Sequence, residues 1–305
     1  MTNVLLGGAI YDALGVFAET KLANYQPLID WDGKTFLGSE HHGLNPGQFS
    51  DDGQMQQMVA NSLIENNGFN PDDLSARYMD WFFSGRARGF GTTTKLAMQN
   101  LQSGKHWSES GIAESYGNGT AMRSAPFGVY FRDDINLLIK NVKIDSAITH
   151  ASNEAEAGAI SIALAAAYAT NNDLDNLIEK IWLRLPDSKV KNTIYSLETL
   201  VNSKYITTKQ ALNVLGTKAD VRETVPSVIY MFLKFGNCHK ACETIIRAGG
   251  DTDSCGSILG ALFGAKDGIK NIPSHLIEQV EDSKKLIELD VQLYNRSNRL
   301  FFPRN

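Results

Sequence analysis

The spacing of apolar residues along this chain predicts helices far more often than strands. Met55, Met58, Val59 and Leu63 fall at offsets of zero, three, four and eight, so their side chains share one helix face. Residues 153–170 form an apolar segment rich in alanine, isoleucine and leucine. Alternating apolar and polar runs bounded by turn dipeptides are scarce, which leaves little support for a sheet. The pattern therefore predicts an all-α fold.

Polar residues mark where the predicted helices begin. Ser50 precedes the helix that carries Met55 and can cap it. Asn153 is the expected N-cap of the second helix, with Glu154 and Glu156 in its first turn. Glycine-containing turns separate the helices, at residues 66–68, 85–91, 117–119 and 249–250.

A third predicted helix follows Asp253 and carries glycine at every fourth position. Gly256, Gly260 and Gly264 lie on one face, where the lack of side chains lets another backbone approach closely. The same spacing drives helix pairing in membranes, but here it indicates tight packing inside a globular core. No low-complexity linker and no fixed-period repeat interrupt the chain. We therefore expect one compact domain over residues 1–305.

Composition narrows the function classes. The chain has 305 residues, is 43% hydrophobic, and carries a net charge of -5, which disfavours a broad contact with nucleic acid or an anionic membrane. No apolar run reaches the roughly 20 residues of a membrane span, and the N-terminus lacks the basic start of a secretory signal. Three cysteines give no disulfide framework. A zinc site is not expected at Cys238, His239 and Cys242, because no second pair of ligands lies at a suitable spacing. We expect the two cysteines to be free thiols. We expect a cytoplasmic protein.

Two clusters of carboxylates and hydroxyls, far apart in the sequence, each precede an apolar helix. The first is Ser50, Asp51 and Asp52, and the second is Asp251, Thr252, Asp253 and Ser254. Each alone is explained by a capped helix start. Two together suggest that the loops meet and share a cation, because four adjacent carboxylates would otherwise repel one another. An all-oxygen donor set selects Mg²⁺ or Mn²⁺, with ligands enough for two ions.

Six ordered segments of the chain resemble the ADP-ribosylglycohydrolase family, which includes ADP-ribosylarginine hydrolases, dinitrogenase reductase-activating glycohydrolases and serine-directed ADP-ribosylhydrolases. The segments are GGAIYDALGVFAE (7–19), SDDGQM (50–55), RGFGTTT (88–94), YGNGTAMRSAP (116–126), THASNEA (149–155) and GGDTDSCGSILGALFGA (249–265). Together they span nearly the whole chain.

The resemblance implies a compact, single-domain all-α fold with two Mg²⁺ ions (Mn²⁺ is the alternative) at the base of an ADP-ribose cleft. The implied metal ligands are Ser50, Asp51, Asp52, Asp251, Asp253 and Ser254. The implied ADP-ribose-binding residues are Gly91, Ser115, Tyr116, Gly117, Asn118, Gly119 and His150, with Gly89 at the border of the cleft. Glycines there would let backbone N–H groups approach the diphosphate, helped by a following helix start. The implied catalytic residues are Glu19, Asp51, Asp52 and Asp253.

Several further residues are assigned roles by position. Asp12 is expected to make structural hydrogen bonds, and Arg123 is left open between a phosphate clamp and a brace for the acidic loops. Three residues depart from the family pattern: Gly53 and Ser254, where threonine is usual, and Tyr11, where glycine is usual. Ser254 keeps its hydroxyl, Gly53 adds flexibility to the first helical turn, and Tyr11 is expected to reshape the cleft.

The expected function is a magnesium-dependent hydrolase that removes ADP-ribose from a modified protein side chain and releases free ADP-ribose. Arginine is the favoured attachment residue, because the SDDGQM segment and the short chain resemble the arginine-directed branches of the family. The expected partners are an ADP-ribosylated protein and ADP-ribose, without nucleic acid or membrane. Two alternatives stay open: a non-catalytic ADP-ribose-binding regulator and a metal-dependent nucleotide phosphohydrolase.

Overall fold

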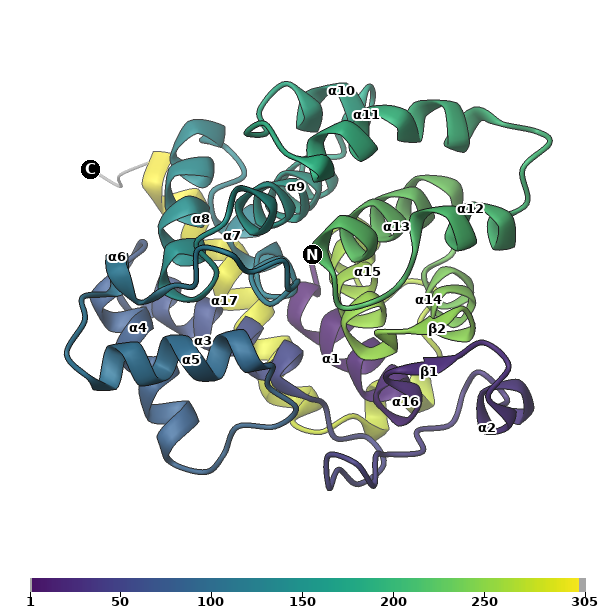
Figure 1. Ribbon diagram of the computed structural model, residues 1–305, viewed down its shortest axis with the longest axis horizontal. Helices are drawn as coiled ribbons and strands as arrows, with labels where there is room; N and C mark the ends of the chain where they lie inside the picture. The colour runs from purple at the N-terminus through teal and green to yellow at the C-terminus, as the bar shows by residue number, and fades with distance from the viewer. Residues whose placement is uncertain (1, 302–305) are drawn as a thin grey trace.

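The computed structural model describes residues 2–301, and its regular secondary structure is almost entirely helical, as the sequence predicted (Figure 1). The helices are α1 (Val4–Gly15), α2 (Gln26–Asp30), α3 (Asp51–Glu65), α4 (Pro71–Phe83), α5 (Thr92–Gln102), α6 (Trp107–Ser110), α7 (Ala125–Tyr130), α8 (Ile135–Thr149), α9 (Asn153–Thr170), α10 (Leu177–Trp182), α11 (Lys189–Asn202), α12 (Thr208–Leu215), α13 (Val221–Lys234), α14 (Cys238–Arg247), α15 (Thr252–Asp267), α16 (Ser274–Gln279) and α17 (Ser283–Phe301). A 3₁₀ turn, η1 (Val16–Ala18), follows α1. Two short strands, β1 (Lys21–Leu22) and β2 (Gly249–Gly250), pair antiparallel.

Helices α1 and α15 form the centre of the molecule and pack along each other (Figure 1). Every residue of α1 is buried, as is α15 from Thr252 to Ala265. A helix that is buried all round belongs to the interior of a domain. Helices α9, α13 and α14 pack against α15, while α3 and α17 pack against α1. The second acidic loop thus begins the central helix α15, and the first begins α3, which packs against α1.

The glycines of α15 allow this central contact, as predicted. A Cβ atom on Gly260 would lie 2.3 Å from the carbonyl oxygen of Gly7 in α1. One on Gly256 would lie 2.4 Å from the Tyr11 carbonyl oxygen, and one on Gly264 would lie 2.2 Å from that of Asn3. These distances are far below van der Waals contact, so any side chain at these positions would push the two helices apart.

Helix starts follow capping rules, with one correction. Ser50 caps α3 and accepts a hydrogen bond from the Asp52 N–H, as expected. Asn153 is not the cap of α9: Ser152 has the extended backbone of an N-cap, and its Oγ accepts from the Ala155 N–H. Adjacent serine and asparagine are both good caps, so composition alone could not separate them.

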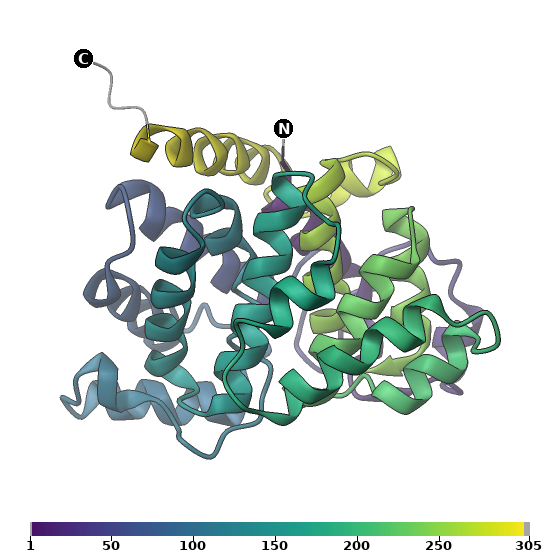
Figure 2. The same ribbon diagram turned by 90° about the horizontal axis from the view of Figure 1, so that it is seen from above.

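The C-terminal helix closes one edge of the molecule (Figure 2). Asp290 of α17 accepts hydrogen bonds from the backbone N–H groups of Leu5 and Leu6, at 2.9 and 3.2 Å. It thus caps α1, whose own N-cap residue, Asn3, makes no capping bond. None of the helices described combines the length and apolar character needed to cross a membrane.

Candidate functional site

The two acidic clusters meet at the ends of the central helices. Ser254, in the first turn of α15, donates a hydrogen bond to Asp52 Oδ2 of α3 at 3.1 Å. Glu19, Asp251 and Asp253 each offer a carboxylate oxygen, and these atoms lie within 4.8 Å of one another. The structure thus brings together residues that are separated by most of the chain.

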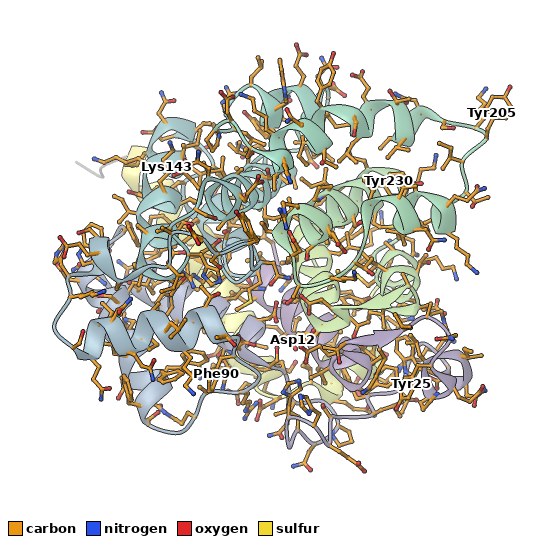
Figure 3. All side chains as sticks on the ribbon, in the orientation of Figure 1. Asp12, Tyr25, Phe90, Lys143, Tyr205 and Tyr230 are labelled. Carbon is orange, nitrogen blue, oxygen red and sulfur yellow. The ribbon has the colours of Figure 1, made fainter. Side chains whose placement is uncertain are left out.

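Asp12 fixes the first acidic loop to α1. This fully buried carboxylate accepts hydrogen bonds from the backbone N–H groups of Ser50 and Gly53, both at 2.9 Å. Figure 3 shows Asp12 near the middle of the molecule. The expected structural role of Asp12 is confirmed, and it explains how α1 sets the position of Asp51 and Asp52.

The β1–β2 pair fixes the second acidic loop beside Glu19. Lys21 pairs with Gly250 and Leu22 with Gly249, and the Thr20 N–H donates to the Gly250 carbonyl at 2.7 Å. Gly249 and Gly250 have φ angles of 76° and 85°, a region that other residues rarely adopt. The two glycines therefore turn the chain so that Asp251 faces the carboxylate of Glu19.

Burial and mutual repulsion raise the pKa values of the clustered carboxylates. Removal from water raises the pKa of Asp51, Asp52 and Asp253 well above the usual range, and neighbouring carboxylates raise them further. Burial also raises the pKa of Asp251. A bound cation would reverse this by stabilising the ionised forms. The arrangement is therefore costly unless positive charge is supplied.

The chemistry of this cluster fits a hard divalent cation. Its donors are carboxylate and hydroxyl oxygens, which Mg²⁺ and Mn²⁺ prefer. Asp52 Oδ1 is buried and has no hydrogen-bond partner among the residues described. A buried carboxylate oxygen without a partner is costly, and a metal ion would satisfy it.

The acidic cluster forms one wall of a cavity of about 250 Å³. The opposite walls come from the segments before α5 and before α7, and from His150. The lining residues are Glu19, Asp51, Asp52, Gly89, Gly91, Thr92, Thr93, Thr94, Gly117, Asn118, Gly119, Met122, His150, Ala219, Asp251, Asp253 and Ser254.

The N-terminus of α5 faces this cavity, a feature that the sequence analysis did not identify. Thr92, Thr93 and Thr94 form its first turn, and its N-cap, Gly91, has no side chain with which to cap it. Free N–H groups and the helix dipole make such a terminus a site for anions. The helix start expected to follow the glycine-rich segment is that of α7, which begins only at Ala125. The threonine run after RGFG was the available signal.

Asn118 links the glycine-rich wall to the acidic wall. Its Nδ2 donates to Asp251 Oδ2 at 2.6 Å and to Thr224 Oγ1 at 3.1 Å. The side chain is buried. Asn118 therefore holds Asp251 in place as well as lining the cavity.

His150 lies beneath the glycine-rich segment. A Cβ atom on Gly119 would lie 2.6 Å from the imidazole, so only glycine allows this approach. The side chain is 3% exposed, and burial lowers the pKa of His150 to about 3. His150 is therefore a neutral imidazole at physiological pH.

This lowered pKa predicts a pH effect on stability. In the unfolded chain His150 binds a proton below about pH 6.5, whereas in the folded chain it stays neutral down to about 3. Because the unfolded state then binds more protons, the contribution of His150 to the unfolding free energy falls by about 2 kcal/mol between pH 7 and pH 5. The free energy of unfolding, measured with urea, should therefore fall less between pH 7 and pH 5 in His150→Gln than in the wild type, and the difference should equal this amount. An identical loss in both proteins would contradict the assignment.

Three residues of the predicted site do not line the cavity. Ser50 Oγ donates to Asp52 Oδ2 at 3.1 Å and so lies next to the acidic wall. Ser115 is buried and hydrogen-bonds Thr93 through its hydroxyl, which ties the glycine-rich segment to α5. Tyr116 is 46% exposed, and its ring packs against the Arg222 guanidinium.

Arg123 and Tyr11 do not have the roles considered for them. Arg123 is fully buried and hydrogen-bonds Asp145 of α8, with Nε 2.9 Å from Oδ2. It is therefore neither a phosphate clamp nor a brace for the acidic loops. Tyr11 does not reshape the cleft, because its hydroxyl points to His239 on α14, 3.3 Å from Nδ1.

Gly53 makes room for an aromatic ring. A Cβ atom there would lie 2.7 Å from the ring of Phe49. A threonine at position 53 would therefore clash with Phe49 unless the ring moved.

His42 is a second site feature that the sequence did not reveal. Its Nε2 pairs with Glu19 Oε2, and this hydrogen bond raises the pKa of His42. The loop around residue 42 thus holds Glu19 over the acidic cluster. The dipeptide His41-His42 carries no spacing that would have indicated this contact.

Comparisons with known proteins show the family of this chain. A family model described as ADP-ribosylglycohydrolase matches residues 1–300. The ADP-ribosylhydrolase ARH3 of Xenopus tropicalis is 27% identical over 79% of this chain and 81% of its own. The ADP-ribosylarginine hydrolase Tri1 of Serratia proteamaculans is 23% identical over 96% of this chain and 78% of its own.

A solved structure titled an ADP-ribosylglycohydrolase-related protein complex shares the fold. It superimposes with a TM-score of 0.74 at 22% identity, covering 97% of this chain and 96% of that chain. With a family model matching nearly the full length, an all-helical fold and an acidic cleft at the start of α15, this chain belongs to the ADP-ribosylglycohydrolase family.

Proposed function

We propose that this protein is a magnesium-dependent hydrolase that removes ADP-ribose from a modified protein side chain and releases free ADP-ribose. The observation that carries the proposal is the meeting of two acidic clusters and Glu19 on one wall of a cavity. The facing walls offer glycine-rich backbone and a helix N-terminus. One wall is suited to cations and the other to a diphosphate.

Six side chains are proposed to hold two magnesium ions, or manganese in their place. They are Ser50, Asp51, Asp52, Asp251, Asp253 and Ser254, with Glu19 adjacent. The bound ions would supply positive charge next to the reacting sugar and lower the pKa of a nearby water. Asp12 and Asn118 keep the carboxylates in place through the hydrogen bonds described above.

The remaining walls of the cavity are proposed to orient ADP-ribose. The N–H groups at the start of α5 would bind the diphosphate. Gly117 and Gly119 would let it approach the backbone closely, although the N–H groups of Gly117 and Asn118 already donate to Ser115 Oγ and to the Ala219 carbonyl. Neutral His150 contributes a hydrogen-bonding imidazole without adding charge. Binding energy from the diphosphate end would then position the distal ribose at the acidic wall.

Glu19 is proposed to move the proton. In the hydrolysis, water attacks C1 of the ribose, the bond from C1 to the side-chain nitrogen breaks, and positive charge develops on the sugar. The Glu19 carboxylate accepts a proton from the attacking water, and the departing nitrogen regains one. His42 holds one oxygen of Glu19, which leaves the other free to accept the proton.

Arginine is the favoured attachment residue. The name of the Serratia relative specifies ADP-ribosylarginine, and that relative covers nearly the whole of this chain. We also propose that the chain works as one domain in the cytoplasm, independently of nucleic acid and membranes. The net charge of -5 and three buried, unpaired cysteines support this setting.

The test is product analysis with and without metal. Arginine-linked and serine-linked ADP-ribosyl proteins are incubated with the protein in Mg²⁺, in EDTA, and in EDTA followed by excess Mg²⁺. Free ADP-ribose should form from the arginine-linked substrate, fall by at least about a hundredfold in EDTA, and return with Mg²⁺. Release of AMP would instead indicate a phosphohydrolase, and binding of ADP-ribose without any product would indicate a regulator.

A further inference from the structure

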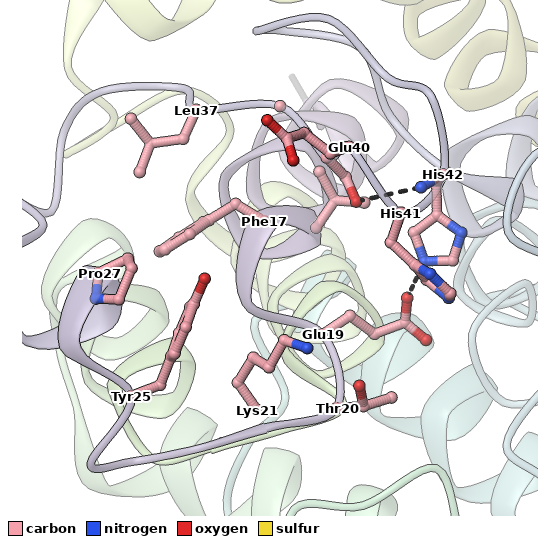
Figure 4. Close-up of a pocket in the computed structure, with 13 residues that line it drawn as sticks. Phe17, Glu19, Thr20, Lys21, Tyr25, Pro27, Leu37, Glu40, His41 and His42 are labelled. Atoms are coloured by element: carbon pink, nitrogen blue, oxygen red, sulfur yellow. Dashed lines mark hydrogen bonds and ion pairs between the residues drawn. The ribbon is translucent and has the colours of Figure 1, made fainter.

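A second cavity lies on the other side of Glu19. Glu19 lines both the acidic cleft and this cavity, which has a volume of about 400 Å³ and is larger than the cleft itself. Figure 4 shows Phe17, Tyr25, Pro27 and Leu37 on one side of it, and Glu19 with its partner His42 on the other. The carboxylate proposed to move the proton thus stands where the two cavities meet.

The walls of this cavity combine apolar surface with unpaired charge. Phe17 and Tyr25 are half-buried, and the Phe17 ring packs on that of Trp31 at 5.3 Å between centroids. Leu37 is 46% exposed although it faces the cavity. At the rim, Glu40 makes no ion pair with any residue described, and the Lys21 ammonium lies 5.9 Å from the Tyr25 ring centroid. Exposed apolar walls next to a reaction centre favour an occupant with an apolar portion.

We infer that this cavity is the subsite for the leaving side chain of the modified protein, an inference that rests on the proposed function. If ADP-ribose fills the acidic cleft, the bond to be broken lies at Glu19 and the leaving group extends away from the cleft. The second cavity is the space that opens there.

The chemistry of the walls selects a long, amphipathic leaving group. An arginine side chain would place its guanidinium beside the Glu19 carboxylate and its methylene stem along Phe17 and Tyr25. A flat cation on an apolar stem suits aromatic walls next to a carboxylate. The peptide around the arginine would then reach Leu37 and Glu40 at the rim. A serine-linked substrate has one side-chain carbon, so it would leave the aromatic walls unused.

Two substitutions in the apolar wall test this subsite. Tyr25→Ala and Leu37→Ala remove wall surface without touching the acidic cluster. The matched control is Tyr195→Ala on α11, an aromatic residue that is 63% exposed and lines a separate cavity. For each full-length variant, kcat and KM are measured on arginine-linked and serine-linked ADP-ribosyl proteins. The Kd for free ADP-ribose and the melting temperature are measured alongside.

Tyr25→Ala should lower kcat/KM for the arginine-linked protein by at least about tenfold, mainly through KM. Leu37→Ala should act in the same direction. The Kd for ADP-ribose, any activity on the serine-linked protein, and the behaviour of Tyr195→Ala should stay within twofold of the wild type. Unchanged kcat/KM in both wall variants would overturn the subsite while leaving the proposed function intact. A matching loss of ADP-ribose affinity would also overturn it, since the cavity would then hold part of ADP-ribose. A wild-type protein that releases no ADP-ribose from any substrate would overturn the proposed function and this subsite together.

Discussion

Replacing Asp253 with alanine is expected to lower the release of ADP-ribose by at least about a thousandfold. Asp253 belongs to the three carboxylates whose oxygens lie within 4.8 Å of one another, and it lines the cleft. Its loss would remove charge that holds the cation at the reacting sugar. The measurement is the rate of ADP-ribose formation from an arginine-linked substrate in saturating Mg²⁺.

The fold should survive this substitution. Repulsion and burial raise the pKa of Asp253, so removing one carboxylate relieves unfavourable charge in the metal-free protein. The metal-free melting temperature is expected to stay the same or rise. Asp267→Ala is the control on the same helix, because Asp267 pairs with Lys266 outside the cleft; it should keep wild-type activity. Activity of Asp253→Ala within tenfold of the wild type would contradict its role.

Replacing Gly260 with alanine is expected to destabilise the protein by at least about 2 kcal/mol. Alanine gains up to about 1 kcal/mol of helix propensity over glycine. The new Cβ, however, would lie 2.3 Å from the carbonyl oxygen of Gly7, and backbone atoms cannot rotate away as a side chain can. The steric effect should therefore exceed the propensity gain. Urea unfolding of the metal-free protein measures the difference.

Gly236→Ala provides the matched control. Gly236 lies between α13 and α14, has no positive φ, and would place its Cβ more than 4 Å from other atoms. Its unfolding free energy should stay within about 0.5 kcal/mol of the wild type. If Gly260→Ala is no less stable than Gly236→Ala, then α1 and α15 are not in the close backbone contact described.

The helices were predictable where pattern and local composition agree. The apolar segment of residues 153–170 matches α9 in full, and the glycine spacing in α15 correctly predicted a close backbone approach. What the sequence could not supply is the partner of each element. Nothing local to Gly256, Gly260 and Gly264 indicates that α1 fills the groove they leave, because that contact joins opposite ends of the chain.

The site was predictable where residue type restricts chemistry. Paired carboxylates and hydroxyls at two helix starts pointed to one shared cluster, and the structure brings them together. His42 could not be found this way, since its contact with Glu19 depends on the path of a loop. The role of α5 was missed because an anion site made of backbone N–H groups has no side-chain signature of its own; the threonine run after RGFG marked only the helix start.

Two residues were misjudged because motif position says little about side-chain direction. Arg123 lies within the YGNGTAMRSAP segment beside the cleft, yet its side chain turns toward Asp145 and the Tyr78 ring. Tyr11 lies one residue before Asp12, but successive residues of a helix point about 100° apart. One side chain therefore faces the acidic loop while the other faces α14.

Binding of Mn²⁺ by the two acidic loops tests the central claim most directly. Electron paramagnetic resonance of free Mn²⁺ would be recorded during titration of the wild type and of the variants Asp52→Asn and Asp253→Asn, one from each loop. If both loops share the ions, the wild type should bind Mn²⁺ and either single substitution should weaken that binding by at least about tenfold. Wild-type affinity in both variants, or loss in one alone, would show that the loops do not form a common metal site.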